Sequence, residues 1–262
     1  MSKIPVKVII PIYENDLNAD EQRSLKQCYN ILSAHPIVFV KPESLDISSW
    51  LNLYPFCTVT SFDDHFFESI AGYNELMLSR QFYERFLDTE YILIYQLDAY
   101  VFKDALMEWV NKGYDYVGAP WLLKPKYHCF YYRFLLTIRS FGYWIQRKPF
   151  NLMIVGDKVG NGGFSLRKVQ SHYAQTELQA KKIAYFLRKS ATYQEFNEDV
   201  FWATQNPTFT YPTWQEAIYF ALDTYPELGY QLMNNEHPFG CHGWKRSKTA
   251  QFWEEKMGAN DF

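Results

Sequence analysis

The residues of this sequence best suited to chemistry are a few acids and one histidine. Asp98 directly follows residues 91–97, an apolar run rich in β-branched and aromatic side chains. Such a run is typical of a strand buried on both faces of an α/β sheet, and ligands bind at the carboxyl ends of these strands. A carboxylate there can hold a divalent cation that clamps a diphosphate. Alternatively, Asp98 only ends the strand and caps the helical segment at residues 103–110.

An acidic pair and a late histidine extend the candidate site. Glu198 and Asp199 follow Asn197, so one of them is a candidate general base. The alternative is that the two acids only occupy the first turn of a helix capped by Asn197. His242 lies between glycines near the carboxyl terminus, a context that suits a metal ligand, although a single histidine is more often structural.

Gly162 and Gly163 belong to a glycine turn at residues 160–163, which runs into an expected strand. Adjacent glycines let the backbone approach a ligand closely or adopt a positive φ. An ordinary tight turn explains the pair equally well.

Strand and helix patterns alternate along the first half of the chain. Strands are expected at residues 6–12, 37–40, 57–61, 91–97 and 114–119, with helices at 16–32, 71–86 and 103–110. A further helix is expected at residues 168–187. This alternation predicts a mostly parallel sheet with crossover helices. The 262 residues contain no internal repeat and no low-complexity linker, so we predict a single α/β domain.

Residues 122–156 interrupt this pattern with a basic, aromatic and helical insertion. The segment holds six basic residues and no Asp or Glu: Lys124, Lys126, Arg133, Arg139, Arg147 and Lys148. Aromatic and apolar residues alternate with them, which suits an anionic membrane surface or a groove for a lipid-linked substrate. The alternative is an insertion whose aromatics pack on the domain. Nucleic acid is a weaker expectation because the rest of the chain is acidic.

Bulk composition excludes little. The net charge is −3 and the hydrophobic content 48%, both ordinary for a soluble globular protein. The four cysteines form no CxxC pair, which favours reduced thiols in a cytosolic protein. The first apolar run is too short for a signal peptide, and no stretch approaches the ~20 residues of a membrane span, so we expect a cytoplasmic protein.

Taken together, these motifs resemble glycosyltransferases of the GT-A fold. Their order is similar to that in β-1,3-galactosyltransferase and Fringe-type enzymes: Gln96-Leu97-Asp98, then Gly162-Gly163-Phe164, then Glu198-Asp199-Val200. The chain also resembles an uncharacterised glycosyltransferase-like domain family of bacterial polysaccharide gene clusters. That resemblance rests on Tyr73-Asn74, Leu78-Ser79, residues 95–102, Gly118-Ala119-Pro120-Trp121 and residues 160–167.

The resemblance implies a single GT-A domain with residues 1–121 as the nucleotide-sugar half and residues 157–262 as the acceptor half. It implies that a sugar is transferred from a nucleoside-diphosphate sugar, which we expect to be a UDP-sugar. The acceptor would be a glycan or a lipid-linked glycan in the synthesis of surface polysaccharide or lipopolysaccharide. The protein would be cytoplasmic and peripheral on the inner face of the membrane. Mn²⁺ or Mg²⁺ would be held by Asp98 and His242, with nitrogen ligation favouring Mn²⁺.

The same resemblance assigns roles to further residues. Asp199 is the expected base of an inverting transfer, with Glu198 second. The other expected donor contacts are Pro11, Tyr13, Arg80, Gln96, Gly162, Gly163 and Lys245. Trp121, Trp202 and Trp244 are candidates for stacking on sugar faces.

One departure from the pattern keeps alternatives open. The usual Asp-X-Asp is Gln96-Leu97-Asp98 here, so only the last acid remains to contact a metal. This substitution supports a non-catalytic member of the fold that binds a nucleotide or a glycan. A nucleotidyltransferase is the weakest alternative, because the segment after the first strand is acidic and lacks glycine.

Overall fold

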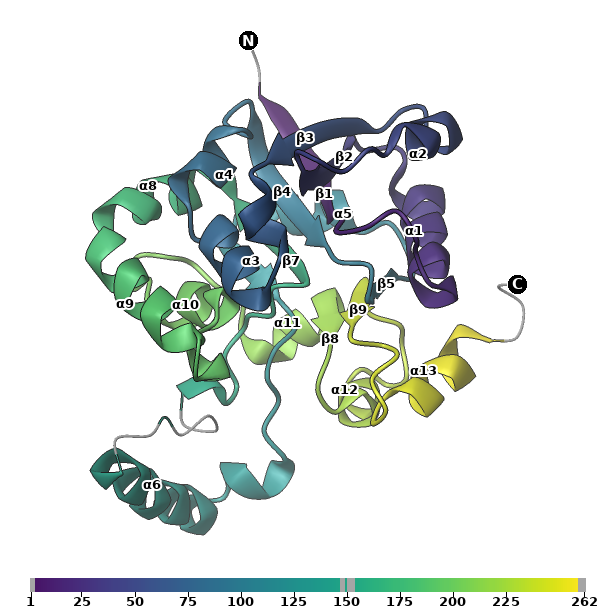
Figure 1. Cartoon of the computed structure of the whole chain (residues 1–262). Coiled ribbons are helices and arrows are strands. Elements are labelled where there is room, and N and C mark those ends of the chain that lie inside the picture. The colour runs from purple at the N-terminus through teal and green to yellow at the C-terminus, as the bar shows by residue number, and fades with distance from the viewer. Residues whose placement is uncertain (1–2, 147–148, 150–153, 259–262) are drawn as a thin grey trace.

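The computed structural model describes residues 3–146, 149 and 154–258. Within these ranges, a six-stranded sheet has the strand order β3-β2-β1-β4-β7-β6 (Figure 1). The first four strands in this order run parallel, whereas β7 is antiparallel to both of its neighbours, β4 and β6. Their bounds are Ile4–Pro11 for β1, Ile37–Pro42 for β2, Thr58–Phe62 for β3, Thr89–Tyr95 for β4, Tyr116–Gly118 for β6 and Phe164–Lys168 for β7. The prediction of an α/β fold with a mostly parallel sheet is therefore confirmed.

Hydrophobic cores cover both faces of this sheet, as the apolar run before Asp98 predicts. Alternate residues of β4 enter different cores, Leu93 the first and Ile92 and Ile94 the second. On the first face pack α1 (Ala19–Leu32), α2 (Ser48–Leu53) and α5 (Leu106–Asn111). On the second pack α3 (Ile70–Met77), α4 (Arg80–Glu84), α8 (Val169–Leu178), α9 (Ala180–Ser190) and α10 (Glu198–Thr204).

Two of the predicted helices are each divided in two. The pattern at residues 71–86 forms α3 and α4, because the Ser79 hydroxyl accepts a bond from Phe82 N and starts a new helix. The pattern at residues 168–187 breaks at Gln179, between α8 and α9. The helix expected at residues 16–32 begins three residues later, at Ala19, because Asn18 and Glu21 form a capping box there.

A second, three-stranded sheet brings the carboxyl-terminal part of the chain to the end of β4. Its order is β5-β9-β8, with bounds Ala99–Val101, Gly240–His242 and Ala221–Leu222. Since β5 starts directly after Asp98 and pairs antiparallel with β9, Ala99 lies opposite His242. Around this sheet lie α11 (Trp214–Phe220), α12 (Pro226–Leu232) and α13 (Ala250–Met257). Two segments far apart in the sequence are thereby held together.

The insertion is connected to the rest of the domain through Trp121 and residues 157–158, a pair of hydrogen-bonded segments that we call the neck. Trp121 N donates to Lys158 O and Asp157 N donates to Trp121 O, at 3.0 and 2.9 Å. Beyond this neck, α6 (Phe130–Ile145) stands apart from both sheets (Figure 1). Arg147 and Lys148 lie outside the described residues, as does the side chain of Trp144. None of the helices in the described ranges has the length and hydropathy needed to cross a bilayer.

Candidate active site

A cleft of about 600 Å³ opens at the carboxyl ends of β1 and β4. Its volume is in the range of small-molecule sites. Segments from the whole chain converge on it: Pro11, Tyr13, Glu14, Leu17, Glu21, Phe67, Glu68, Ser69, Ile70, Tyr73, Asn74, Gln96, Leu97, Asp98, Asn161, Gly162, Gly163, Asn197, Glu198, Asp199, His242 and Arg246. Most of the residues predicted from the sequence are thus in one place.

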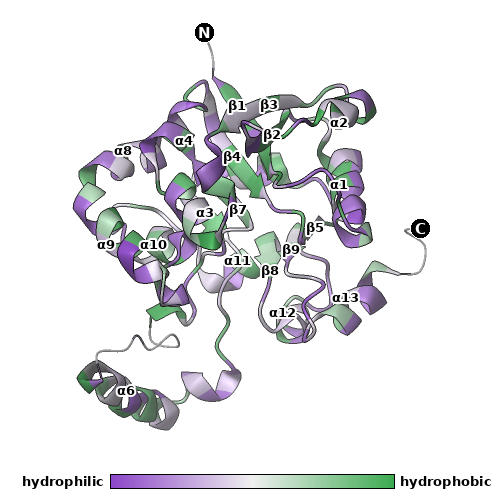
Figure 2. Cartoon of the chain, viewed as in Figure 1, coloured by the Kyte–Doolittle hydropathy of each residue, from purple (hydrophilic) through white to green (hydrophobic). Residues whose placement is uncertain are grey.

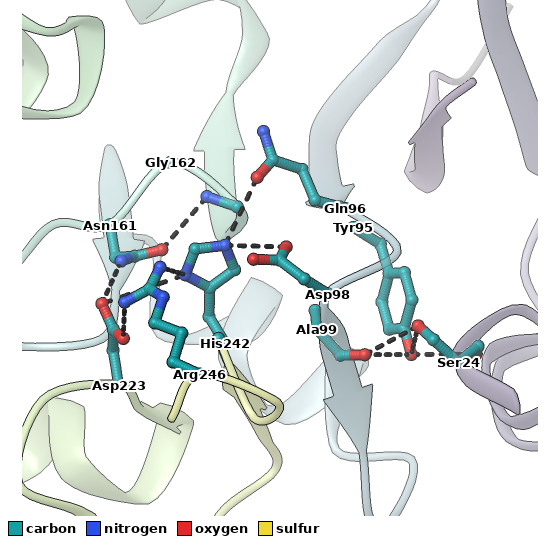
Figure 3. Close-up of polar contacts among 12 residues, drawn as sticks. Ser24, Tyr95, Gln96, Asp98, Ala99, Asn161, Gly162, Asp223, His242 and Arg246 are labelled. Carbon is teal, nitrogen blue, oxygen red and sulfur yellow. Dashed lines mark hydrogen bonds and ion pairs between the residues drawn. The ribbon is translucent and has the colours of Figure 1, made fainter. Parts of the chain in front are cut away.

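Asp98 and His242 face each other at one side of the cleft (Figure 3). Asp98 Oδ1 lies 3.0 Å from His242 Nε2, and Gly243 N donates to Asp98 O at 2.9 Å. Hydrogen bonds from α1 fix the turn before β5, because the Ser24 hydroxyl donates to Ala99 O at 2.7 Å. Asp98 does not cap the following helix, whose N-cap is Ala105; the acid that contacts the start of this helix is Asp104, which accepts from Leu106 N at 3.0 Å.

A polar network extends from His242 to residues that sequence reasoning missed. Arg246 Nη1 donates to Asp223 Oδ1, and Asn161 Nδ2 donates to Asp223 Oδ2, both at 2.5 Å. Asn161 Oδ1 in turn accepts from Gly163 N at 3.1 Å. In the sequence, the one feature that could have indicated Asp223 is the short apolar segment before it. Arg246 was missed because its neighbour Lys245 was chosen on charge alone.

Two carboxylates determine the charge of His242. Burial alone would lower the pKa of this ring, but Asp98 and Asp223 outweigh it and raise the pKa to about 9. His242 is therefore an imidazolium at neutral pH. Arg246 Nη2 lies 3.2 Å from His242 Nδ1. Because both nitrogens then carry a proton, they cannot form a hydrogen bond with each other, and the Asp223 carboxylate beside both groups compensates their positive charge. For Asp98, burial is outweighed by His242, which lowers the pKa of the carboxyl group.

The glycine turn forms the wall between the part of the cleft that contains Asp98 and His242 and the part that contains Glu198 and Asp199. A Cβ on Gly163 would lie 2.0 Å from His242 Nε2, and one on Gly162 would lie 2.2 Å from Glu198 Oε1. Neither glycine has a positive φ, so close approach is what requires them. Gly163 O also accepts from Gln96 N at 2.8 Å, which ties this wall to the end of β4.

On the other side of the cleft, the acidic pair begins α10. The buried Glu198 forms an ion pair with the buried Arg167 at 3.0 Å. Burial raises the pKa of Glu198 to about 7, although Arg167 opposes the shift. Asp199 is partly exposed to the cleft, and burial raises the pKa of its carboxyl group as well. Of the two acids, Asp199 is the one that a bound molecule can reach.

The start of α10 is capped from another helix. Asn197 occupies the N-cap position, but its side chain accepts no bond from α10. Instead, Asn74 of α3 accepts from Glu198 N at 3.0 Å and donates to Asn197 Oδ1 at 3.1 Å. The predicted cap is therefore corrected: the side chain that does the capping is Asn74, a residue the sequence resemblance included without a role.

Several predicted contacts lie elsewhere. Arg80 is not part of the cleft, because it pairs with Glu177 and stacks over Tyr173, 4.2 Å from the ring centroid. Lys245 also points away, toward Asp20 and Glu254, at 3.1 and 2.8 Å. Trp202 and Trp244 are fully buried, so these two rings are not free to stack on a sugar, and the partly buried Trp121 lies against Gly160 and does not line the cleft.

The residues present can offer a cation two protein ligands, Asp98 and His242. No group of three His, Cys, Asp or Glu side chains with metal-binding geometry occurs among the described residues. Two ligands fit a Mn²⁺ or Mg²⁺ ion that shares its coordination with a substrate diphosphate. Such binding would displace the proton that His242 holds.

Comparison with solved structures shows the same fold. The chain is similar to mouse xyloside xylosyltransferase 1, at 13% identity and a TM-score of 0.52 over 93% of this chain and 98% of that one. It is also similar to the galactosyltransferase LgtC in complex with donor and acceptor sugar analogues, at 12% identity and a TM-score of 0.56 over 96% and 93%. At these identities the similarity establishes a GT-A fold.

Sequence comparison identifies the family. No curated protein matches the sequence. The model of the DUF5672 family, described as a protein of unknown function, matches residues 56–242. This match covers most of the chain and includes β4, the glycine turn, the acidic pair and His242. The chain is therefore a member of the DUF5672 family.

Proposed function

We propose that this protein is a glycosyltransferase that moves a sugar from a nucleoside-diphosphate sugar, a UDP-sugar, to a hydroxyl of a glycan or lipid-linked glycan. The observation that supports this most is the composition of the cleft. The cationic side chains of His242 and Arg246, balanced by Asp98 and Asp223, lie on one side, and Asp199 lies on the other, with the glycine turn between them. Bacterial surface polysaccharide is the acceptor class that the sequence resemblance implies.

Each side of the cleft suits one half of a transfer reaction. The donor diphosphate carries negative charge that grows as it leaves, and the imidazolium of His242 and the guanidinium of Arg246 stabilise that charge. Tyr13 packs edge-on against Phe67 at 5.8 Å between ring centroids, and its exposed ring offers a stacking surface for a nucleobase or a sugar. A bound Mn²⁺ or Mg²⁺ at Asp98 and His242 would take the place of the His242 proton and would supply Lewis-acid neutralisation of the diphosphate instead of the imidazolium.

Asp199 is the base in the mechanism that we propose. The acceptor oxygen forms a bond to the anomeric carbon while the bond from that carbon to the diphosphate oxygen breaks. The hydroxyl proton passes to the Asp199 carboxylate, and attack opposite the leaving group inverts the anomeric centre. Glu198 is a positioning residue in this scheme, because its ion pair with Arg167 fixes the start of α10.

Nucleotide release from a panel of UDP-, GDP- and CMP-sugars, with and without Mn²⁺, tests the proposal. We expect Asp199→Asn to keep donor affinity and to lose about 10²–10⁴-fold in turnover, the usual contribution of a general base. Asp98→Ala should abolish the Mn²⁺-dependent part of donor binding in calorimetry. Asp104→Asn is the matched control, since this acid also follows a strand but bonds to His35 and lies outside the cleft.

Two results would contradict the mechanism. Near-normal turnover in Asp199→Asn, or a product of retained anomeric configuration, would remove Asp199 from the base role. Donor binding without any transfer or hydrolysis would favour the alternative of a non-catalytic nucleotide- or glycan-binding protein. Gln96 in place of an acid is the feature that supports that alternative.

A further inference from the structure

Helix α6 has its hydrophobic face on the outside. Seven large apolar residues of this helix have exposed fractions from 40% to 85%: Phe130, Tyr131, Phe134, Leu135, Ile138, Phe141 and Ile145. Figure 2 shows strongly hydrophobic residues along α6 although the helix stands apart from the cores. A surface helix of a globular protein ordinarily turns such residues toward the core.

Helical geometry places all seven on one side. At 100° per residue, their positions fall within an arc of about 140°. Leu136, the buried residue among the described side chains of α6, lies about 170° from the centre of this arc. Other parts of the chain therefore cover the side of the helix that carries Leu136, and the apolar arc lies on the opposite side.

Cations border this apolar arc on both sides. Arg133 lies about 60° beyond one edge and Arg139 about 40° beyond the other. Lys124 and Lys126 precede the helix, and the whole of residues 122–156 contains no Asp or Glu. An outward apolar face with arginines along its margins is the pattern of a helix that lies in the interface of an anionic bilayer.

We propose that α6 docks the protein on an anionic lipid membrane. The apolar arc enters the boundary between headgroups and acyl chains, and Arg133, Arg139 and the preceding lysines contact lipid phosphates. The attachment point is the neck at Trp121 and Asp157, so the helix can lie on a membrane while the body stays in water. This inference is independent of the proposed catalytic function.

A second copy of the chain is a less suitable partner for this face. Two α6 helices packed through their apolar arcs would bring the bordering arginines of both copies together, with no acid in residues 122–156 to compensate them. Like charges placed opposite one another at an interface oppose association. Anionic lipid instead supplies the negative charge that the segment lacks.

Flotation with vesicles tests the proposal, with the full chain mixed with phosphatidylcholine alone or with phosphatidylcholine containing 30% phosphatidylglycerol (about one lipid in three). We expect binding to the anionic vesicles only, weakening as salt rises. Phe134→Ser/Ile138→Ser should reduce binding by about tenfold or more. Lys126→Gln/Arg133→Gln should reduce it by about fivefold per cation removed.

Leu53→Ser/Leu178→Ser is the matched control, because these leucines of α2 and α8 are even more exposed, at 73% and 76% against 56% and 55% for Phe134 and Ile138, but lie outside the α6 arc. All the substituted side chains are exposed, so thermal unfolding should remain unchanged in each variant. Binding that ignores lipid charge, or no binding to either vesicle, would overturn the proposal. Concentration-dependent dimerisation that Phe134→Ser/Ile138→Ser abolishes would also overturn it and assign the face to a second copy.

Discussion

The buried carboxyl group of Glu198 should make the stability of this protein depend on pH, and Glu198→Gln isolates that dependence. Burial raises the pKa of Glu198 from 4.5 to about 7 in the folded protein. Because the folded pKa lies above the unfolded value, the contribution of this group to the free energy of unfolding is complete below pH 4.5. It decreases as the pH rises from 4.5 and is lost once the pH passes 7, since between these two values the carboxyl group ionises in the unfolded chain but not in the folded protein.

The difference between the two pKa values corresponds to about 3 kcal/mol in the free energy of unfolding. Glutamine keeps the size and an oxygen acceptor for Arg167 Nη2, now 3.0 Å from Glu198 Oε1, but it does not titrate. Whatever constant cost the lost charge imposes, the stability of Glu198→Gln relative to the wild type should rise by about 2–3 kcal/mol from pH 5 to pH 8. Urea unfolding followed by tryptophan fluorescence at each pH measures this difference.

Glu177→Gln provides the matched control, because Glu177 also pairs with an arginine but is 72% exposed in its side chain. Its difference from the wild type should stay flat across the same range, as expected for a solvated ion pair. A flat difference for Glu198→Gln as well would refute the argument. A difference that falls with rising pH would mean that Arg167 holds the pKa of Glu198 below its ordinary value.

Three further substitutions test other parts of the structure. Burial lowers the pKa of His172 to about 3, so its contribution to stability is complete above pH 6.5 and declines below it; the stability of His172→Phe relative to the wild type, measured by urea unfolding, should rise by about 2 kcal/mol from pH 7 to pH 5, a comparison in which the opposite trend of Glu198 cancels. Gly163→Ala should weaken UDP-sugar binding in calorimetry by tenfold or more (about 1.4 kcal/mol), because a methyl group would overlap His242, whereas Gly142→Ala has open space around it. Asp223→Asn should lower the pKa of His242 below about 9, measured by NMR titration of the ring; an unchanged pKa would show that Asp98 alone sets it.

The sequence predicted the sheet and the buried strand before Asp98 because those features depend on local pattern, although β4 ends at Tyr95, two residues before the expected end. A continuous apolar run of strand length indicates a strand that is buried on both faces, and it can be recognised in the sequence without any tertiary information. Helix ends were less accurate where side chains decide them. Ser79 and Gln179 interrupt patterns whose hydrophobic spacing is continuous. The Ser79 side chain caps the new helix, whereas the Gln179 side chain makes no cap bond, so neither break shows in the hydrophobic spacing.

Site residues could be predicted from the sequence where they adjoin a recognisable strand end or glycine turn. The contacts between them could not, because these depend on the register in which distant strands pair. Asp98 and His242 were both selected, yet their contact follows from the pairing of Ala99 with His242 across β5 and β9. The choice of Lys245 over Arg246 failed for the same reason. Neighbouring residues after a strand point in different directions, and composition gives no information about which one faces the cleft.

The charge balance of the cleft bears on the substitution of Gln96 for an acid. His242 and Arg246 carry two positive charges, and Asp98 and Asp223 carry two negative charges within the same network. A second acid at position 96 would add a negative charge 3.3 Å from His242, where Gln96 Oε1 now approaches the ring without one. The positive and negative charges of the network cancel, so the network has no excess positive charge with which to neutralise the negative charge of a bound diphosphate. A cation that arrives with the donor fits these residues better than one that the protein holds alone.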